Sequence, residues 1–276
     1  MTTLAESFAF SQTSLRDYSD CPRRFQLRYA LEQPWPAVES EPLLERERSA
    51  ELGRRFHQMA QQHTLGLPTD QITASAGQPD LVRWWRNYLN VPPRDLPSTL
   101  RRTEVMLTAP LGKYRLAAKY DLLALEPGRR AMIVDWKTEH KRPTRAQLLT
   151  RMQTRVYRYV LVQAGASLNG RIANPQSITP EQVTLIYWFA EYPTEPEALR
   201  YDAAQYAEDA AFLIQLVGEI VTCTDVEWRK TEDENRCRYC VYRSLCNRGI
   251  TAGTGDDSDI EDDIDVQLAT VEEIAY

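Results

Sequence analysis

The stretch Ile133-Val134-Asp135-Trp136-Lys137 places an acid and an amine inside an apolar run. Five of the seven residues from Ala131 to Lys137 are apolar, which predicts a buried strand. Side chains two apart on a strand share a face, so Asp135 and Lys137 would point one way and their apolar neighbours into the opposite layer. A carboxylate there indicates a site, although an Asp-x-Lys sequence alone also occurs where the two charges only satisfy each other.

A second apolar run, from Arg115 to Leu125, is interrupted by Lys119 and Asp121. If the turn at Glu126-Pro-Gly joins the two runs as neighbouring strands, two carboxylates and one ammonium meet at one end of a sheet. Mg²⁺ and Mn²⁺ bind oxygen, and one or two carboxylates plus a substrate phosphate suffice to hold them. Such a metal lowers the pKa of a bound water and offsets charge on a phosphate under attack, while a lysine positions that water.

Length and cysteine content bound the class of protein. The chain has 276 residues, enough for one large domain with added helical parts. No apolar run approaches the length of a membrane span, and the N-terminus lacks a basic segment followed by an apolar one, so we expect a soluble cytoplasmic protein with no membrane partner. Five cysteines, an odd number, argue against a disulfide framework and for metal or cluster ligation.

The net charge of −6 comes from one end of the chain. Residues 249–276 contain nine acidic residues and no Lys or Arg, and without them 33 basic residues face 30 acidic ones, about +3. The composition of this segment predicts a disordered acidic tail. A solubilising tail is the simpler interpretation, and a mimic of nucleic-acid charge that covers the basic body is the alternative.

Local patterns predict the remaining elements. Hydroxyl residues before Leu15 predict a helix that begins near Ser11 to Ser14, and Pro22 suits the first turn of the next helix. Further helices are expected at 43–63, 78–89 and 203–221 and from residue 144 onward, and strands at 101–108, 114–125, 131–137 and 182–189.

The predicted helix 43–63 carries one histidine of interest. His57 lies near its apolar face, where a lone histidine is more often a hydrogen-bonded core residue than a metal ligand. Gly53, one turn earlier, permits close packing at some cost in helicity. Glu104, an extra acid near the start of the sheet, is interpreted as an edge residue rather than a ligand.

The helix that follows Thr144 begins with a capping box to Gln147. Gln153 and Tyr157, four residues apart, fall together on one flank. Three arginines form a stripe on nearly the opposite side, which we interpret as solvated surface without a special role in DNA binding: Arg151, Arg155 and Arg158.

The last motif is Cys237-x2-Cys240-x5-Cys246, whose spacing suits thiolates around one metal centre. Three thiolates need a fourth ligand, and Cys21 and Cys223 are the remaining cysteines. Cys223 lies at a helix end and is interpreted as a packed core thiol. Cys21 opens a helix beside arginines, which favours a thiolate, and is the fourth ligand that we select. Spacing alone does not separate Zn²⁺ from an iron–sulfur cluster.

Together these residues resemble the RecB-type branch of the PD-(D/E)XK nuclease superfamily over residues 8–248. In chain order, the segments that carry the resemblance are Ser14-Leu15 with Cys21-Pro-Arg-Arg-Phe, Gly53-Arg-Arg-Phe-His57, Lys119-Tyr-Asp121, Val134-Asp135-Trp-Lys137-Thr, Gln153-x3-Tyr157 and the three late cysteines. Each is weak alone, and six in the family's order make a strong signal. Trp136 departs from the tyrosine that is common at its position.

The resemblance implies an α/β fold with a restriction-endonuclease-like mixed β-sheet core flanked by helices. It also implies roles for single residues around Mg²⁺ or Mn²⁺. The implied metal ligands are His57, Asp121, Asp135 and the main-chain carbonyl of Trp136. Lys137 would serve the attacking water or the transition state, and Gln153 and Tyr157 would support the site and position the DNA strand.

The resemblance further implies a [4Fe–4S] cluster on Cys21, Cys237, Cys240 and Cys246, with Zn²⁺ as the alternative. The cluster would belong to a helical lobe built from both chain ends, residues 8–31 and 223–248. Residues 40–66 would form the helix that bears the histidine, and residues 100–190 the catalytic core.

The function that these resemblances imply is metal-dependent hydrolysis of DNA, by an exonuclease on single strands or ends. The process would be repair, recombination or CRISPR spacer acquisition, with a helicase or a CRISPR integrase as partner. The alternative is a catalytically silent nuclease fold that binds DNA for such a partner, and a third interpretation is a zinc protein with no nuclease role. No Gly-x4-Gly-Lys-Ser/Thr motif occurs, so the chain is not itself predicted to be an ATP-driven motor.

Overall fold

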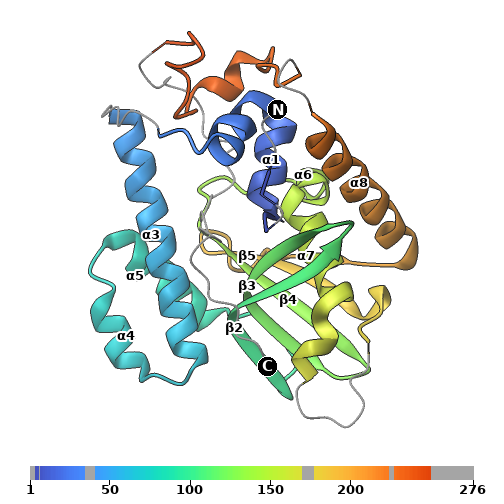
Figure 1. Cartoon of the computed structure of the whole chain (residues 1–276). Helices are drawn as coiled ribbons and strands as arrows, with labels where there is room; N and C mark the ends of the chain where they lie inside the picture. The colour runs from blue at the N-terminus through green and yellow to red at the C-terminus, as the bar shows by residue number, and fades with distance from the viewer. Residues whose placement is uncertain (1–3, 6, 35–40, 170–176, 224–226, 250–276) are drawn as a thin grey trace.

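The computed structural model describes residues 4–5, 7–34, 41–169, 177–223 and 227–249. The acidic segment beyond Gly249 lies outside the described residues, so its disorder stays a prediction. Within the described part of the chain, a mixed sheet lies between helices, as expected (Figure 1).

The central sheet has six strands in the order β1-β3-β4-β5-β6, with β2 paired to β3. The pairs β2–β3, β3–β4 and β5–β6 are antiparallel, and β1–β3 and β4–β5 are parallel. The strands are β1 (Ala9–Ser11), β2 (Leu100–Leu111), β3 (Tyr114–Glu126), β4 (Arg130–Lys137), β5 (Val183–Phe189) and β6 (Glu197–Arg200).

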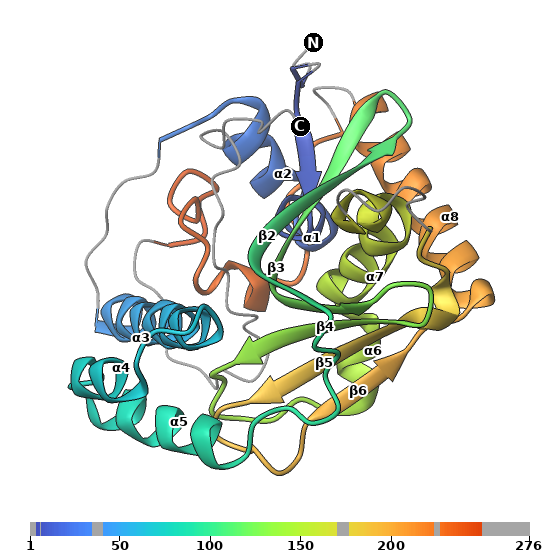
Figure 2. The ribbon, with the colours of Figure 1, turned by 90° about the horizontal axis from the view of Figure 1, so that it is seen from below.

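The long strand β3 holds two partners at different places on the same edge. β2 pairs with it from end to end, whereas β1 pairs at residues 115–117 and β4 at residues 122–126. Residues 118–121 therefore lie in a fork between β1 and β4. Figure 2 shows β1 beside one part of the curved β2–β3 pair and β4 beside another.

One face of the sheet packs against α1 (Gln12–Asp20), α6 (Arg145–Thr150), α7 (Met152–Ala164) and α8 (Ala203–Thr222) (Figure 1). Its core joins Ile133 of β4 and Leu185 of β5 to Leu15, Val156 and Leu213 of these helices. Each buried aliphatic side chain contributes about 1.5–3 kcal/mol of transfer free energy, an upper estimate of its effect on stability.

The opposite face packs against α3 (Glu41–Thr64), α4 (Thr69–Ser75) and α5 (Pro79–Asn90). Its separate core contains Val134 and Trp136 of β4, with Phe56 of α3 and Trp84 of α5. The alternation predicted for the strand is confirmed, because these apolar residues leave Asp135 and Lys137 on the other side of the sheet.

The two ends of the described chain pack together. The short helix α2 (Pro22–Phe25) and the π-helix η1 (Gln26–Ala30) follow α1, and the ring of Phe25 stacks on Trp228 at 5.8 Å. Arg23 donates its backbone N–H to the carbonyl of Arg229 at 3.0 Å. The C-terminal part is mostly turns, with η4 (Glu234–Cys237) as its helix; the other 3₁₀ helices are η2 (Gly165–Asn169) and η3 (Pro180–Gln182).

The helix predicted from Thr144 is broken in two. Its capping box is present, but Arg151 has extended backbone angles, φ −60° and ψ 136°, and separates α6 from α7. The prediction that the arginine stripe is solvated surface is wrong. Arg158 is 3 % exposed and pairs with Asp209 of α8, because α8 covers this side of α7. The sequence patterns also missed β1, β6 and α4.

Candidate active site and metal centre

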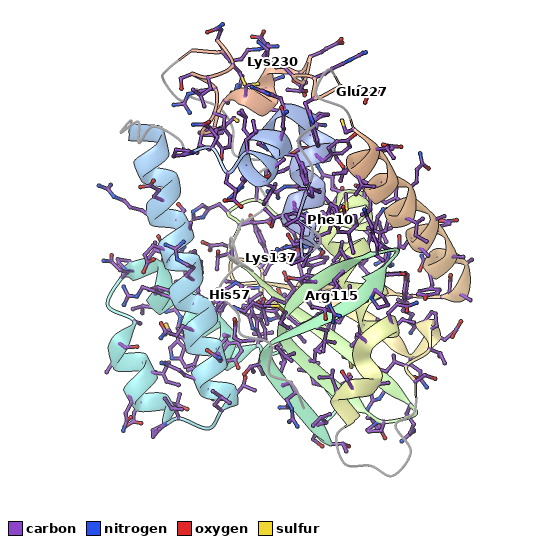
Figure 3. All side chains as sticks on the ribbon, in the orientation of Figure 1. Phe10, His57, Arg115, Lys137, Glu227 and Lys230 are labelled. Atoms are coloured by element: carbon purple, nitrogen blue, oxygen red, sulfur yellow. The ribbon has the colours of Figure 1, made fainter. Side chains whose placement is uncertain are left out.

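A cleft of about 250 Å³ at the fork of the sheet brings the predicted site residues together. Asp121 comes from β3, Asp135 and Lys137 from β4, and His57 from α3 on the other side of the sheet. The other predicted residues that line the same cleft are Trp136, Gln153 and Tyr157. In Figure 3 His57 and Lys137 lie between α3 and the sheet.

Strand register sets the two carboxylates side by side. Leu122 pairs with Val134, so the next residues outward, Asp121 and Asp135, are opposite each other on one face. Asp121 Oδ2 accepts a hydrogen bond from the Trp136 N–H at 2.9 Å. Burial alone would raise the pKa of Asp121, but the neighbouring His57 lowers it below the usual range, so this carboxylate is charged.

Asp135 and Lys137 form a buried pair, 2 % and 4 % exposed. Their Oδ2 and Nζ atoms lie 3.1 Å apart. Burial raises the pKa of Asp135 to about 6 against the opposing effect of Lys137, and the Asp121 carboxylate adds to the rise. Burial alone would lower the pKa of Lys137, but Asp135 outweighs it, so the amine stays an ammonium ion.

His57 reaches the carboxylates from α3. Its Nδ1 lies 3.2 Å from Asp121 Oδ1 but forms no aligned hydrogen bond. Burial would lower its pKa, and the Asp121 carboxylate raises it to about 8. One turn earlier, a Cβ on Gly53 would lie 3.1 Å from Thr138 Oγ1, so the absence of a side chain lets α3 approach the end of β4.

The helix α7 supports the acid of β4 from behind. Gln153 Nε2 donates to Asp135 Oδ1 at 2.7 Å. The Tyr187 hydroxyl donates weakly to Gln153 Oε1 at 3.5 Å and lies 2.8 Å from Thr154 Oγ1. Tyr187 stands opposite Asp135 in the register of β4 and β5, a supporting role that its strand pattern did not reveal. Tyr157 is buried, and its backbone carbonyl accepts from the Tyr120 hydroxyl at 2.9 Å.

Glu104 of β2 lines the cleft, although the sequence pattern indicated an edge residue of the sheet. Among the described residues, ligand atoms of His57, Glu104 and Asp121 lie within 4.8 Å of one another, a group that could hold a metal ion. Glu104 has φ +54°, in the left-handed region that side chains rarely adopt, and its carboxylate lies 2.6 Å from Lys119 Nζ. The expectation of a plain edge residue thus missed its position in the cleft.

The donor set fits a divalent cation. It offers carboxylate oxygens and an imidazole, the ligands that Mg²⁺ and Mn²⁺ accept in proteins. Two buried atoms at the cleft form no aligned hydrogen bond, but each faces a charged neighbour: His57 Nδ1 lies 3.2 Å from Asp121 Oδ1, and Asp135 Oδ2 lies 3.1 Å from Lys137 Nζ. The residues present therefore supply the oxygen and nitrogen donors that a divalent cation would need.

Four cysteines surround a second, smaller hollow, where the chain ends meet: Cys21, Cys237, Cys240 and Cys246. Cys223 does not line it. The Thr231 N–H donates to Cys21 Sγ at 3.4 Å. Burial raises the pKa of the Cys237, Cys240 and Cys246 thiols, so they are protonated at neutral pH.

The fold and the cleft define the class of protein. The chain belongs to the PD-(D/E)XK nuclease superfamily, whose family model matches residues 9–247. No curated protein matches the chain.

Solved structures with a similar fold include a candidate exonuclease from Eubacterium rectale, with a TM-score of 0.49, 13 % identity and coverage of 90 % of this chain and 91 % of that one. They also include SSO0001, with a TM-score of 0.38, 13 % identity and coverage of 86 % and 85 %. Within the part of the chain that the structure describes, every helix is too short or too polar to cross a membrane.

Proposed function

We propose that this chain is a deoxyribonuclease that hydrolyses phosphodiester bonds with Mg²⁺ or Mn²⁺, as an exonuclease on single strands or ends. The observation that carries the proposal is the meeting of His57, Asp121, Asp135 and Lys137 in one cleft, although His57 comes from the helix α3 and the other three from the sheet. A structural ion pair would not need an imidazole from the far helical layer.

The side chains divide the work of hydrolysis. Asp121, Asp135 and His57 would hold the cation, with the Trp136 carbonyl as a further oxygen. When bound, the cation would lower the pKa of the attacking water and offset charge on the phosphate. Lys137 is an ammonium ion beside Asp135, so we assign it to stabilising the phosphate in the transition state rather than to taking a proton. Gln153 holds Asp135 in place.

The test is cleavage of end-labelled single-stranded DNA in Mg²⁺ or Mn²⁺ by the wild type and by Asp135→Asn and Lys137→Ala variants. We expect cleavage by the wild type and a loss of at least about 100-fold in both variants. Substrates with blocked ends should be resistant if the enzyme acts from termini. Cleavage that persists in both variants would contradict the proposal, and DNA binding without any cleavage would favour the silent DNA-binding module.

We further propose that the cysteine hollow holds a [4Fe–4S] cluster with a structural role, as in the RecB-type branch. The support for a cluster is the meeting of four cysteines from both chain ends around one hollow. Broad absorbance near 400 nm in protein purified without oxygen supports it. Colourless protein with one zinc per chain contradicts it.

The proposed cellular role is repair, recombination or spacer acquisition, beside a helicase or a CRISPR integrase. Its support is the combination of a nuclease cleft with cysteines contributed by both chain ends. Co-purification of the chain with a candidate helicase or integrase at equal stoichiometry would test this part separately.

A further inference from the structure

The fork in the sheet connects the candidate active site to the start of α1. β1 ends at Ser11, opposite Ala117 of β3, and α1 begins at the next residue. Because β1 runs parallel to β3, its end points toward Asp121. The four steps from Ala117 to Asp121 span about 13 Å at the usual rise of about 3.3 Å per residue. The N-terminus of α1 therefore lies a few nucleotides' length from the carboxylates.

One face of β3 forms the floor between these two places. Ala117, Lys119 and Asp121 alternate along the strand and all line the cleft. The acids gather at the far end, where Glu104 and Asp121 lie. At the near end the lining consists of Ser11, Gln12, Thr13, Ala117 and Ala118, which carry no carboxylate. The floor thus leads from a cation-binding end to an end that would not repel an anion.

The start of α1 offers hydrogen-bond donors at this near end. The Ser11 hydroxyl accepts from the Ser14 N–H at 3.2 Å, and the Ser14 hydroxyl accepts from the Ser11 N–H at 2.9 Å. This capping box leaves the N–H groups of Gln12 and Thr13 without a partner inside the helix. The helix dipole also favours negative charge at this point.

The side chain of Thr13 is an independent sign of a ligand. It is only 7 % exposed and lines the cleft, and no described residue hydrogen-bonds its hydroxyl. A phosphate oxygen would give the Thr13 hydroxyl an acceptor.

We propose that the N-terminus of α1 binds a second phosphodiester of the substrate strand, through the N–H groups of Gln12 and Thr13 and the Thr13 hydroxyl. This inference rests on the proposed nuclease function and deepens it. The scissile phosphate lies at Asp121 and Asp135, and the second phosphate fixes how far the strand advances past them. The ligand is a phosphodiester anion of an extended single strand, and Thr13 acts as a positioning residue.

The experiment uses a set of labelled oligodeoxynucleotides, each with one neutral methylphosphonate linkage at a different distance from the scissile bond. For the wild type, we expect a neutral linkage at one distant position to slow cleavage about tenfold, the value of one charge-assisted hydrogen bond. Thr13→Val keeps the shape of the side chain without the hydroxyl, and should lose most of that sensitivity. Thr13→Ser keeps the hydroxyl and should retain it.

The outcomes separate this inference from the nuclease proposal. If the wild type cuts unmodified DNA but no distant linkage matters, or if Thr13→Val leaves the penalty unchanged, the subsite is wrong and the nuclease proposal stands. If the wild type does not cut, the same series is measured as binding by fluorescence anisotropy, with the same pattern expected. Should Thr13→Val not fold, Gln12→Pro removes one N–H where proline is tolerated, with Gln12→Ala as its control.

Discussion

Asp135 uses its two carboxylate oxygens differently. Oδ1 accepts the hydrogen bond from Gln153 at 2.7 Å, whereas Oδ2 lies 3.1 Å from Lys137 Nζ. The first contact fixes the plane of the carboxylate and so orients the second oxygen, which would be a ligand of the proposed cation. Partners that orient metal ligands in this way are commonly worth about 10–100-fold in metal affinity or activity.

We therefore predict that Gln153→Leu raises the Mn²⁺ concentration needed for half-maximal cleavage by about tenfold or more. Gln163→Leu, at the exposed end of the same helix, is the matched control and should leave this concentration unchanged. The measurement is the rate of oligonucleotide cleavage across a Mn²⁺ titration. Equal titration curves for both variants would show that Gln153 does not orient Asp135.

Single site residues could be predicted from the sequence where the alternation of a strand or the order of motifs marks them. Asp121, Asp135 and Lys137 interrupt apolar runs, so strand periodicity was enough to place them together. Glu104 was not predicted as a cleft residue. Its position depends on a left-handed backbone angle, which a glutamate in the sequence does not indicate. Tyr187 is a buried aromatic in a buried strand, and only the register of β4 against β5 shows which side chain it supports.

The helix α3 reaches the sheet because Gly53 has no side chain. A Cβ there would lie 3.1 Å from Thr138 Oγ1, whereas a Cβ on Gly218 of α8 would have no atom within 4 Å. Replacing glycine with alanine inside a helix normally stabilises it by about 1 kcal/mol. Alanine at Gly218 would therefore show only the gain in helix stability, whereas alanine at Gly53 would show that gain together with the cost of the contact with Thr138.

We predict that Gly218→Ala raises the free energy of unfolding by about 1 kcal/mol and that Gly53→Ala gains less or loses stability. Because α3 carries His57, Gly53→Ala should also weaken cleavage while Gly218→Ala does not. Urea unfolding and oligonucleotide cleavage measure the two effects. A full gain in stability for Gly53→Ala, with normal cleavage, would show that α3 moves aside freely.

Element boundaries were predictable where capping or turn residues mark them. The Thr144 capping box and the helix start after Ser11 are both present. The break at Arg151 was missed, since the apolar period runs through it without a Gly or Pro. Side-chain hydrogen bonds hold the break: the Arg151 guanidinium donates to Glu139, and Thr154 Oγ1 donates across the break to the carbonyl of Leu148 at 2.6 Å.

Contacts between distant segments hold the whole molecule together. Glu191, which follows β5, accepts from Trp84 Nε1 at 2.8 Å and from Arg83 Nε at 3.1 Å, both on α5. Burial alone would raise the pKa of Glu191, but these hydrogen bonds lower it below its ordinary value of 4.5. The ionised form therefore stabilises the fold above about pH 4.5, and that contribution is lost as the pH falls through the lowered pKa.

We predict that Glu191→Gln lowers the free energy of unfolding by about 1 kcal/mol at pH 7. The difference between wild type and variant should shrink as the pH falls through the lowered pKa of Glu191, because the protonated acid is neutral like glutamine. Urea unfolding at several pH values measures it. A difference that stays constant from pH 7 to pH 3 would show that shape, not charge, accounts for the contact.

The proposed cluster can be tested by comparing Cys21, which lines the cysteine hollow, with Cys223, which does not. If the proposed cluster is present, Cys21→Ser should abolish its absorbance near 400 nm and lower Tm by about 5 °C or more, because the chain ends lose their common anchor. Cys223 lies outside the hollow, so Cys223→Ser should keep the absorbance and most of the Tm. Absorbance that persists in Cys21→Ser would mean that Cys21 is not a ligand.

The packing of both chain ends into one lobe has a consequence for protein synthesis. A ribosome releases Cys21 long before Cys237, which follows 216 positions later. At about 5–20 residues per second, the early cysteine waits about 10–40 s for its companions. Translation that stops before residue 237 leaves Cys21 without the three late cysteines. If the proposed cluster forms, its ligand set is complete only after residue 246 has been made, so a shorter polypeptide cannot form it.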